Sequence, residues 1–347
     1  MFQKKTAPEG REKKTYEKPK MTRRQKITHV VLLAALLLII GATWMTRLPR
    51  YYANLFIDHY DGSSSVLSEM KGLAHTDGDS ALLLPLQISF DDWKQRTLRD
   101  DVTVTAPDGA VLRGGLYDAG SDVTVILLHS FDGSSAESDY LFAPFYAGKG
   151  YNILLPDNRA HGESGGTCVT YGRAEGGDVA AWVELLLERY GAEHQVILHG
   201  DTLGGSAALA GAAAVEADPA LAGSVKFVVA ESPSVNLYDS AVYLLRNQFR
   251  MPSPVALLCD HYAKKSLGQS MKAIDLAELT RGCDTPLLML QGTEDAVVDP
   301  AAVAAFCEGY SGPSELFTAE CAHGMVYASR TADCQSVLEG YIDAYIG

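Results

Sequence analysis

The segment from residue 195 to residue 210 constrains the fold of this chain more than any other part of the sequence. Its apolar start, Gln195–Leu198, predicts a buried strand, and its small-residue end, Ser206–Ala210, predicts a helix. Between them stands the sequence His-Gly-Asp-Thr-Leu-Gly-Gly. A strand, a tight glycine-rich turn and a helix form a nucleophile elbow when the turn reads G-x-S-x-G. Here Thr202 occupies the position of the Ser.

The spacing of the turn has a physical reason. Gly200 and Gly204 flank Thr202 because the neighbouring backbone passes too close for side chains. The N–H of Leu203, at the start of the helix, would face the oxygen of a reacting carbonyl. Thr202 would be strained, since a β-branched residue at positive φ is a conformational outlier that costs about 1–3 kcal/mol. The alternative is a glycine-rich turn whose Thr only makes local hydrogen bonds.

Two further residues with catalytic side chains, Asp295 and His323, each follow a predicted strand and come after Thr202 in the chain. Asp295 comes just after the apolar run 287–292, and His323 comes on a loop after a predicted last strand at 315–317. An Asp in such a place can support a catalytic His. Taken singly, the His would be a solvated loop residue and the Asp a turn residue or helix cap. Together with Thr202 they give the order nucleophile, acid, base.

The motifs that surround these residues resemble those of the α/β hydrolase superfamily, from about Val102 to the end of the chain. They are most similar to the membrane-anchored bacterial members of its serine aminopeptidase-like and acyl-hydrolase-like branch. The motifs are L-L-H at 127–129, P-D-N-R-A-H-G-E-S at 156–164, H-G-D-T-L-G-G at 199–205, Q-G-T-E-D-A-V-V-D-P at 291–300 and A-H-G at 322–324. The resemblance implies an α/β fold with a mostly parallel sheet, helices on both faces and a helical cap.

The same resemblance implies the roles of the site residues. Thr202 takes the place of the nucleophilic Ser, Asp295 is the acid and His323 is the base. Phe131 and Leu203 supply the backbone N–H groups of the oxyanion hole. The chain departs from the family at Thr202 and at Ser130, where members carry Gly after the His of the oxyanion loop.

Arg159 and His161 follow another predicted strand, at 151–157. We expect them to organise the loop beside the cleft and to have no catalytic role.

The N-terminal part differs in composition from the rest. Residues 1–26 contain ten Lys or Arg and three Asp or Glu, which predicts a basic cytoplasmic tail. Residues 27–46 are apolar and long enough to cross a bilayer, at 1.5 Å per residue. A cleaved signal peptide is the alternative, but the long basic segment and the lack of an A-x-A site favour a signal anchor. The excess of basic residues before the helix predicts a single-pass protein of the cell membrane with its hydrolase domain extracytoplasmic.

Charge and cysteine content limit the partners. Residues 27–347 carry 19 Lys or Arg against 40 Asp or Glu, so nucleic acid is a poor candidate partner. Six Cys in an exported domain permit disulfides without specifying their pairing, and none has C-x-x-C spacing. We therefore expect no metal and no cofactor.

The rest of the predicted organisation follows from composition. Residues 47–100 form a juxtamembrane segment, in which Thr76–Asp79 is predicted as a loop. Residues 101–347 form the hydrolase domain, with a helical cap at 234–282.

Two functions from different classes remain open. The first is a serine-hydrolase-like enzyme of the esterase or peptidase class, which cleaves an ester, thioester or amide of a small-molecule, acyl or peptide substrate. The second is a catalytically silent hydrolase fold that binds a ligand or partner. The presence of Asp295 and His323 favours the enzyme, and Thr202 favours the silent fold.

Overall fold

The computed structural model describes residues 21–57, 77–131, 141–252 and 254–347. Most of the predicted basic tail lies outside these ranges. The chain divides into two compact units, one ending at Leu48 and one running from Pro49 to Gly347. Helix α1, Arg23–Ile57, runs through the boundary. Its stretch Arg23–Asn54 is long and apolar enough to cross a membrane, with a mean hydropathy of 2.2 over its most apolar window.

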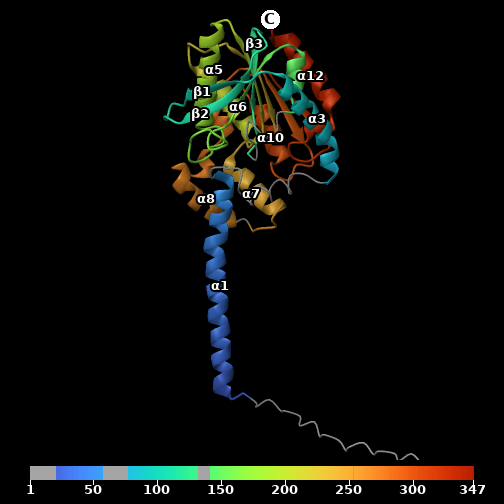
Figure 1. Cartoon of the computed structure of the whole chain (residues 1–347). Coiled ribbons are helices and arrows are strands. Elements are labelled where there is room, and N and C mark those ends of the chain that lie inside the picture. Colours follow the sequence, from blue (N-terminus) through green and yellow to red (C-terminus); the bar gives the residue numbers. More distant parts are fainter. Residues whose placement is uncertain (1–20, 58–76, 132–140, 253) are drawn as a thin grey trace, which may run out of the picture. The chain divides into compact units, whose positions relative to one another are not determined.

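The second unit is built on an eight-stranded, mostly parallel sheet, as predicted (Figure 1). The strand order is β1-β2-β4-β3-β5-β6-β7-β8. β1 and β2 form an antiparallel hairpin, β2 pairs antiparallel with β4, and the remaining pairs are parallel. The strands span Asp100–Thr105, Val111–Tyr117, Val123–Leu128, Asn152–Pro156, Gln195–Asp201, Val225–Glu231, Leu287–Gly292 and Ser314–Ala319, in the order β1 to β8.

Helices cover both faces of this sheet because its strands are apolar on both sides. In β3 the alternate residues Ile126 and Leu128 face one core, and Val125 and Leu127 face the other. The first core is covered by α5 (Glu175–Tyr190), α6 (Leu203–Ala217) and α10 (Pro300–Gly309). The second core is covered by α3 (Asp77–Arg96), α4 (Ala143–Gly148), α11 (Val326–Ser329) and α12 (Thr331–Tyr345). Figure 1 shows α5 and α12 on opposite sides of the sheet.

A helical insertion separates β6 from β7, in the stretch where a cap is expected. It consists of α7 (Leu237–Asn247), α8 (Pro254–Leu267), the short 3₁₀ helix η1 (Met271–Ala273) and α9 (Leu276–Leu279). Asn236 caps the start of α7, since its side chain accepts hydrogen bonds from the N–H groups of Tyr238 and Asp239.

The prediction of a loop at Thr76–Asp79 is wrong for Asp77–Asp79, and Thr76 lies outside the described residues. These residues form the first turn of α3, despite the Gly at its start and Pro85 in its interior. The helix is held by packing: Phe90 is fully buried, and the Trp93 ring lies 4.7 Å from that of Tyr117. Tertiary burial here outweighs unfavourable local propensity.

The six cysteines lie within the described ranges and are buried, and Cys259, Cys283, Cys307 and Cys334 are free thiols. Burial raises the pKa of Cys259 to about 12 and that of Cys307 to about 11. The thiols of Cys259 and Cys307 therefore stay protonated and serve as small apolar core residues.

Candidate active site

The sharp turn between β5 and α6 has the backbone geometry that the sequence predicts. Thr202 stands between them with φ 53° and ψ −103°, a region that costs a β-branched residue conformational strain. Its N–H donates to the carbonyl of Glu231 at 2.8 Å, and its carbonyl accepts from the N–H of Ser206 at 3.1 Å. The turn is thus fixed to β6 on one side and to the first turn of α6 on the other.

The two flanking glycines are required by close backbone contacts. A Cβ on Gly200 would lie 2.1 Å from the carbonyl oxygen of Gly204. A Cβ on Gly204 would lie 1.9 Å from the carbonyl oxygen of Leu128, at the end of β3. Neither contact can be relieved by moving a side chain, because both partners are backbone atoms.

Asp295 and His323 are brought together, although 28 residues separate them. His323 Nδ1 lies 2.7 Å from Asp295 Oδ2, and both residues are buried. Gln291 also donates to Asp295 Oδ2, and the N–H groups of Val297 and Val298 donate to Oδ1 at 2.8 Å each. Burial alone would raise the pKa of Asp295, but the charge and hydrogen bond of His323 and these amides hold it below its usual value.

Thr202 and His323 line the same small cavity, which has a volume of about 70 Å³. Pockets for drug-sized ligands are several times larger, at about 300–1,000 Å³. The cavity therefore suits a compact reacting group. Its walls also include Leu83, Ser130, Leu141, Phe142, Asp201, Glu231, Gly324, Tyr327 and Ala328.

Two carboxylates of this cavity, Asp201 and Glu231, are not among the site residues that the sequence predicts. Thr202 Oγ1 donates to Asp201 Oδ1 at 3.0 Å, and Glu231 Oε1 accepts from the N–H of Val326 at 2.7 Å. Each is the last residue of its strand. An acidic residue at the carboxyl end of a predicted parallel strand is therefore the sequence feature that could have indicated them. Leu83 was also missed, because it comes from the unpredicted helix α3.

The two predicted oxyanion donors lie at the carboxyl ends of neighbouring strands. Leu203 is the first residue of α6, where the N–H groups have no partner within the helix. Phe131 follows β3 and is buried, and its carbonyl lies 2.8 Å from His161 Nε2. Residues 132–140, which continue this loop, lie outside the described ranges.

The loop after β3 is fixed by buried polar side chains. His129 Nε2 accepts from the N–H of Asn158 at 2.9 Å, and its Nδ1 donates to the carbonyl of Ser130 at 2.7 Å. Burial, with repulsion from His161, lowers the pKa of His129 to about 3. Arg159 donates two hydrogen bonds to Asp178, at 2.6 and 2.7 Å. Arg159 thus fixes the loop after β4 to α5, and His161 contacts the loop after β3 through the carbonyl of Phe131. Both residues organise the loops beside the cavity, as expected.

Another buried histidine, His199, lies on β5, three residues before Thr202. The Tyr146 hydroxyl lies 2.9 Å from Nδ1 of His199, and burial lowers the pKa of His199 to about 3 from an ordinary 6.5. Because the unfolded chain then binds a proton below about pH 6.5 and the folded chain does not, stability falls as the pH drops from about 6.5 towards 3. A histidine whose pKa is lowered in this way decreases the free energy of unfolding by about 1.4 kcal/mol for each pH unit of acidification in that range.

We therefore expect His199→Asn to flatten the dependence of stability on pH. An Asn oxygen can replace Nδ1 as the acceptor but does not titrate, so the slope between about pH 6 and 5 should decrease by about 1.4 kcal/mol per pH unit. Urea denaturation of the full chain in neutral detergent micelles, repeated at several pH values, measures this slope. An unchanged slope for His199→Asn would contradict the assignment.

Comparison with known proteins supports the fold and the broad class. No family model matches the chain. Among curated proteins, the chain is 26% identical over 196 residues to YqkD of Bacillus subtilis, itself described as uncharacterized. That match covers 56% of this chain and 63% of YqkD, less than two thirds of the relative's length.

Solved structures give wider coverage. The esterase PF2001 of Pyrococcus furiosus is 25% identical with a TM-score of 0.62, and the match covers 74% of this chain and 94% of the esterase. GrgF, an α/β hydrolase of Penicillium sp. sh18, is 19% identical with a TM-score of 0.52 over 71% of this chain and 97% of its own. DcsB, solved with a substrate analogue, is 17% identical with a TM-score of 0.55 over 72% and 100%. The latter two show the fold alone.

The chain therefore has an α/β-hydrolase fold, and its structural likeness to an esterase supports a hydrolase function. The serine aminopeptidase-like branch stays a prediction from the motifs.

Proposed function

We propose that this protein is a membrane-anchored hydrolase that cleaves a small ester, thioester or amide with Thr202 as its nucleophile. The 2.7 Å contact between His323 Nδ1 and Asp295 Oδ2, in a cavity that Thr202 and His323 share, carries the proposal. With Nδ1–H donated to Asp295, Nε2 of His323 holds the lone pair that can take a proton. The likeness to PF2001, described as an esterase, adds to the case for ester chemistry.

The reaction would follow the serine-hydrolase sequence. His323 takes the hydroxyl proton of Thr202 as Oγ1 attacks the substrate carbonyl, and the N–H groups of Leu203 and Phe131 stabilise the oxyanion. Collapse of this intermediate expels the leaving group, which receives the proton from His323. Water, activated by the same histidine, then hydrolyses the acyl-threonine ester.

One observation favours the second candidate, a silent fold that binds a ligand. The Thr202 hydroxyl donates to Asp201 Oδ1 at 3.0 Å. A hydroxyl has a single proton to donate, so it must turn away from Asp201 before His323 can accept that proton. Asp201 and Glu231 also place negative charge beside the predicted oxyanion. An active enzyme must overcome both effects.

Labelling by a fluorophosphonate probe distinguishes the two candidates. We expect the wild-type full chain in detergent micelles to be labelled and to hydrolyse short neutral acyl esters, and Thr202→Ala to do neither. Neutral esters are suitable because the cavity is small and carries two carboxylates. Thr285→Ala, which alters a buried Thr outside the site, is the matched control and should retain labelling. A folded wild-type protein that is not labelled supports the silent fold.

Membrane attachment is part of the proposal and has its own support. The α1 stretch Arg23–Asn54 has sufficient length and hydropathy, and basic residues concentrate before it. We expect the chain to stay with the membrane fraction through high-salt washing and to be released by detergent. Release by salt alone would contradict the anchor.

A further inference from the structure

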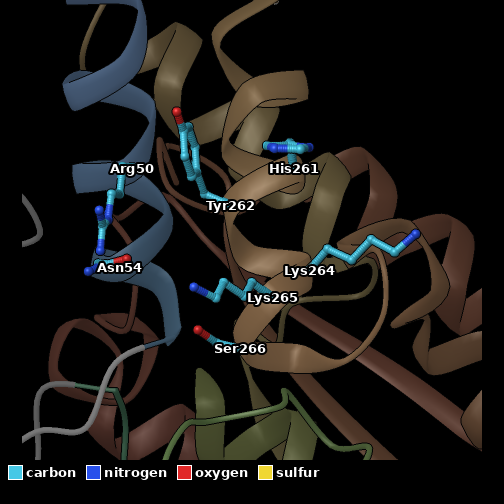
Figure 2. A pocket seen from close by; sticks show the side chains of 7 residues that line it. All are labelled: Arg50, Asn54, His261, Tyr262, Lys264, Lys265 and Ser266. Carbon is cyan, nitrogen blue, oxygen red and sulfur yellow. The ribbon is translucent and has the colours of Figure 1, made fainter. Parts of the chain in front are cut away.

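A wide cavity lies between the end of α1 and the helix α8, away from the candidate active site. Its volume is about 780 Å³. Figure 2 shows Arg50 and Asn54 one turn apart on α1, with Lys265 of α8 pointing towards them. His261, Tyr262, Lys264 and Ser266 of α8 complete the described lining.

The two walls of this cavity are held in place by packing within the second unit. On α1, Tyr52 and Ala53 are buried, and the Tyr52 ring lies 4.9 Å from that of Phe249. The carbonyl of Ile57 accepts from the N–H of Val169 at 3.2 Å. On α8, Cys259 and Ala263 are one turn apart and fully buried. The lining side chains therefore project from two fixed helices.

The charge of this cavity is opposite to that of the unit that contains it. Residues 49–347 carry 18 Lys or Arg against 40 Asp or Glu, yet the described lining has three cations and no carboxylate. Within the described residues, Arg50, Lys264 and Lys265 form no ion pair. Elsewhere Lys149, Arg159 and Arg189 pair with acidic side chains. Three neighbouring cations that have no acidic partner among the residues the structure describes favour an anionic ligand.

The donors around these cations suit a phosphate group. A guanidinium presents a fork of N–H donors and the ammonium groups supply mobile point charges, which together recognise phosphate oxygens. Asn54, Tyr262 and Ser266 add neutral donors at the same cavity. We propose that this cavity binds a phosphate-bearing anion, with Arg50 and Lys265 as its principal ligands.

The position of Arg50 in the chain suggests where that phosphate comes from. Arg50 stands five residues after Met45, near the end of the apolar run, and five residues span at most about 18 Å in any conformation. The headgroup of an anionic phospholipid is therefore within reach if α1 crosses the membrane. This source rests on the proposed anchor, whereas binding of a soluble phosphate ester does not.

Hydrogen exchange of the full chain in neutral detergent micelles tests the proposal and separates the two sources. One arm adds phosphatidylglycerol, with phosphatidylcholine as the uncharged comparison. The other adds inorganic phosphate or glycerol 3-phosphate. We expect slower exchange in peptides that cover residues 258–268, with no change in α10. A local readout is needed because the basic N-terminal tail also attracts anionic lipid.

Paired variants identify the residues responsible. Arg50→Gln/Lys265→Gln should raise the midpoint of the titration at least tenfold, since each cation near an anionic lipid contributes about a fivefold factor. Lys226→Gln/Lys272→Gln removes the same charge outside the cavity and should leave the midpoint within twofold. Lys265→Arg, which keeps the charge, should retain binding.

Each outcome decides the question. Protection by phosphatidylglycerol that depends on the cavity cations supports a lipid site, and protection by soluble phosphates alone supports a phosphate site without the lipid. Protection in neither arm, or an equal effect of both double variants, overturns the proposal. Because no outcome depends on ester hydrolysis, failure of this site is distinguishable from failure of the proposed activity.

Discussion

Thr202→Ser is expected to increase ester hydrolysis by about ten- to a hundredfold. In the proposed mechanism the Thr202 methyl is bonded to the same carbon as the attacking oxygen and restricts its rotation, while the hydroxyl donates to Asp201. Serine lacks that methyl and can turn its hydroxyl towards His323 at lower cost. Removing about 1.4–2.8 kcal/mol from the activation free energy gives this range.

Steady-state rates with a short neutral acyl ester, together with the rate of fluorophosphonate labelling, measure this gain. Thr285→Ser is the matched control, since Thr285 is buried and hydrogen-bonded outside the cavity. It should change the rate less than twofold. A Thr202→Ser protein that folds but hydrolyses no faster than the wild type would show that the methyl does not limit the reaction.

The thermal stability of the same variant gives a second, independent result. Thr at φ 53° carries backbone strain that Ser carries less of, so Thr202→Ser should melt at the same temperature or higher. Thr285→Ser, at a buried position with no positive φ, should melt slightly lower because it loses a methyl group. A larger loss at Thr202 than at Thr285 would mean that the methyl stabilises the turn.

The elements around Thr202 could be predicted from sequence because their signals are local. Apolar runs such as 287–292 define buried strands whatever the rest of the chain does. The glycines at 200 and 204 report a close backbone approach within a few residues of themselves. The contact between Asp295 and His323 followed from the parallel order of the strands, which brings their carboxyl ends to one edge.

Other features depended on contacts between distant segments. Helix α3 has a weak local signal, and it forms where Phe90 can be buried and Trp93 can pack against Tyr117 of the sheet. Its Leu83 then closes one side of the candidate active site. The hydrogen bond from Thr202 to Asp201 depends on a side-chain rotamer that no sequence pattern specifies. The cavity lined by Arg50 and Lys265 is formed by α1 and α8 together, and these helices lie about 200 residues apart in the sequence. Neither segment alone therefore indicates the cavity.

Gly204→Ala is expected to prevent stable folding, which is the largest effect on stability that we predict. The new Cβ would lie 1.9 Å from the carbonyl oxygen of Leu128 and 2.7 Å from that of His129, so α6 could keep its position only by moving away from β3. Because α6 packs its buried face on the first core, that movement would expose Ala207 and Ala208 to water. A backbone clash in the core belongs to the class of substitutions that cost at least about 4 kcal/mol, a large part of the stability of a typical domain.

The matched control for this prediction is Gly340→Ala. Gly340 lies inside α12, and a Cβ there would meet no atom within 4 Å. Alanine restricts the unfolded chain and favours the helix, so this variant should be more stable than the wild type by about 0.4–1 kcal/mol. Urea denaturation of both full-length variants in detergent micelles tests the contrast. If Gly204→Ala unfolds at the same urea concentration as the wild type, the turn can relax without cost, and the close packing of α6 on β3 is not what requires glycine at the elbow.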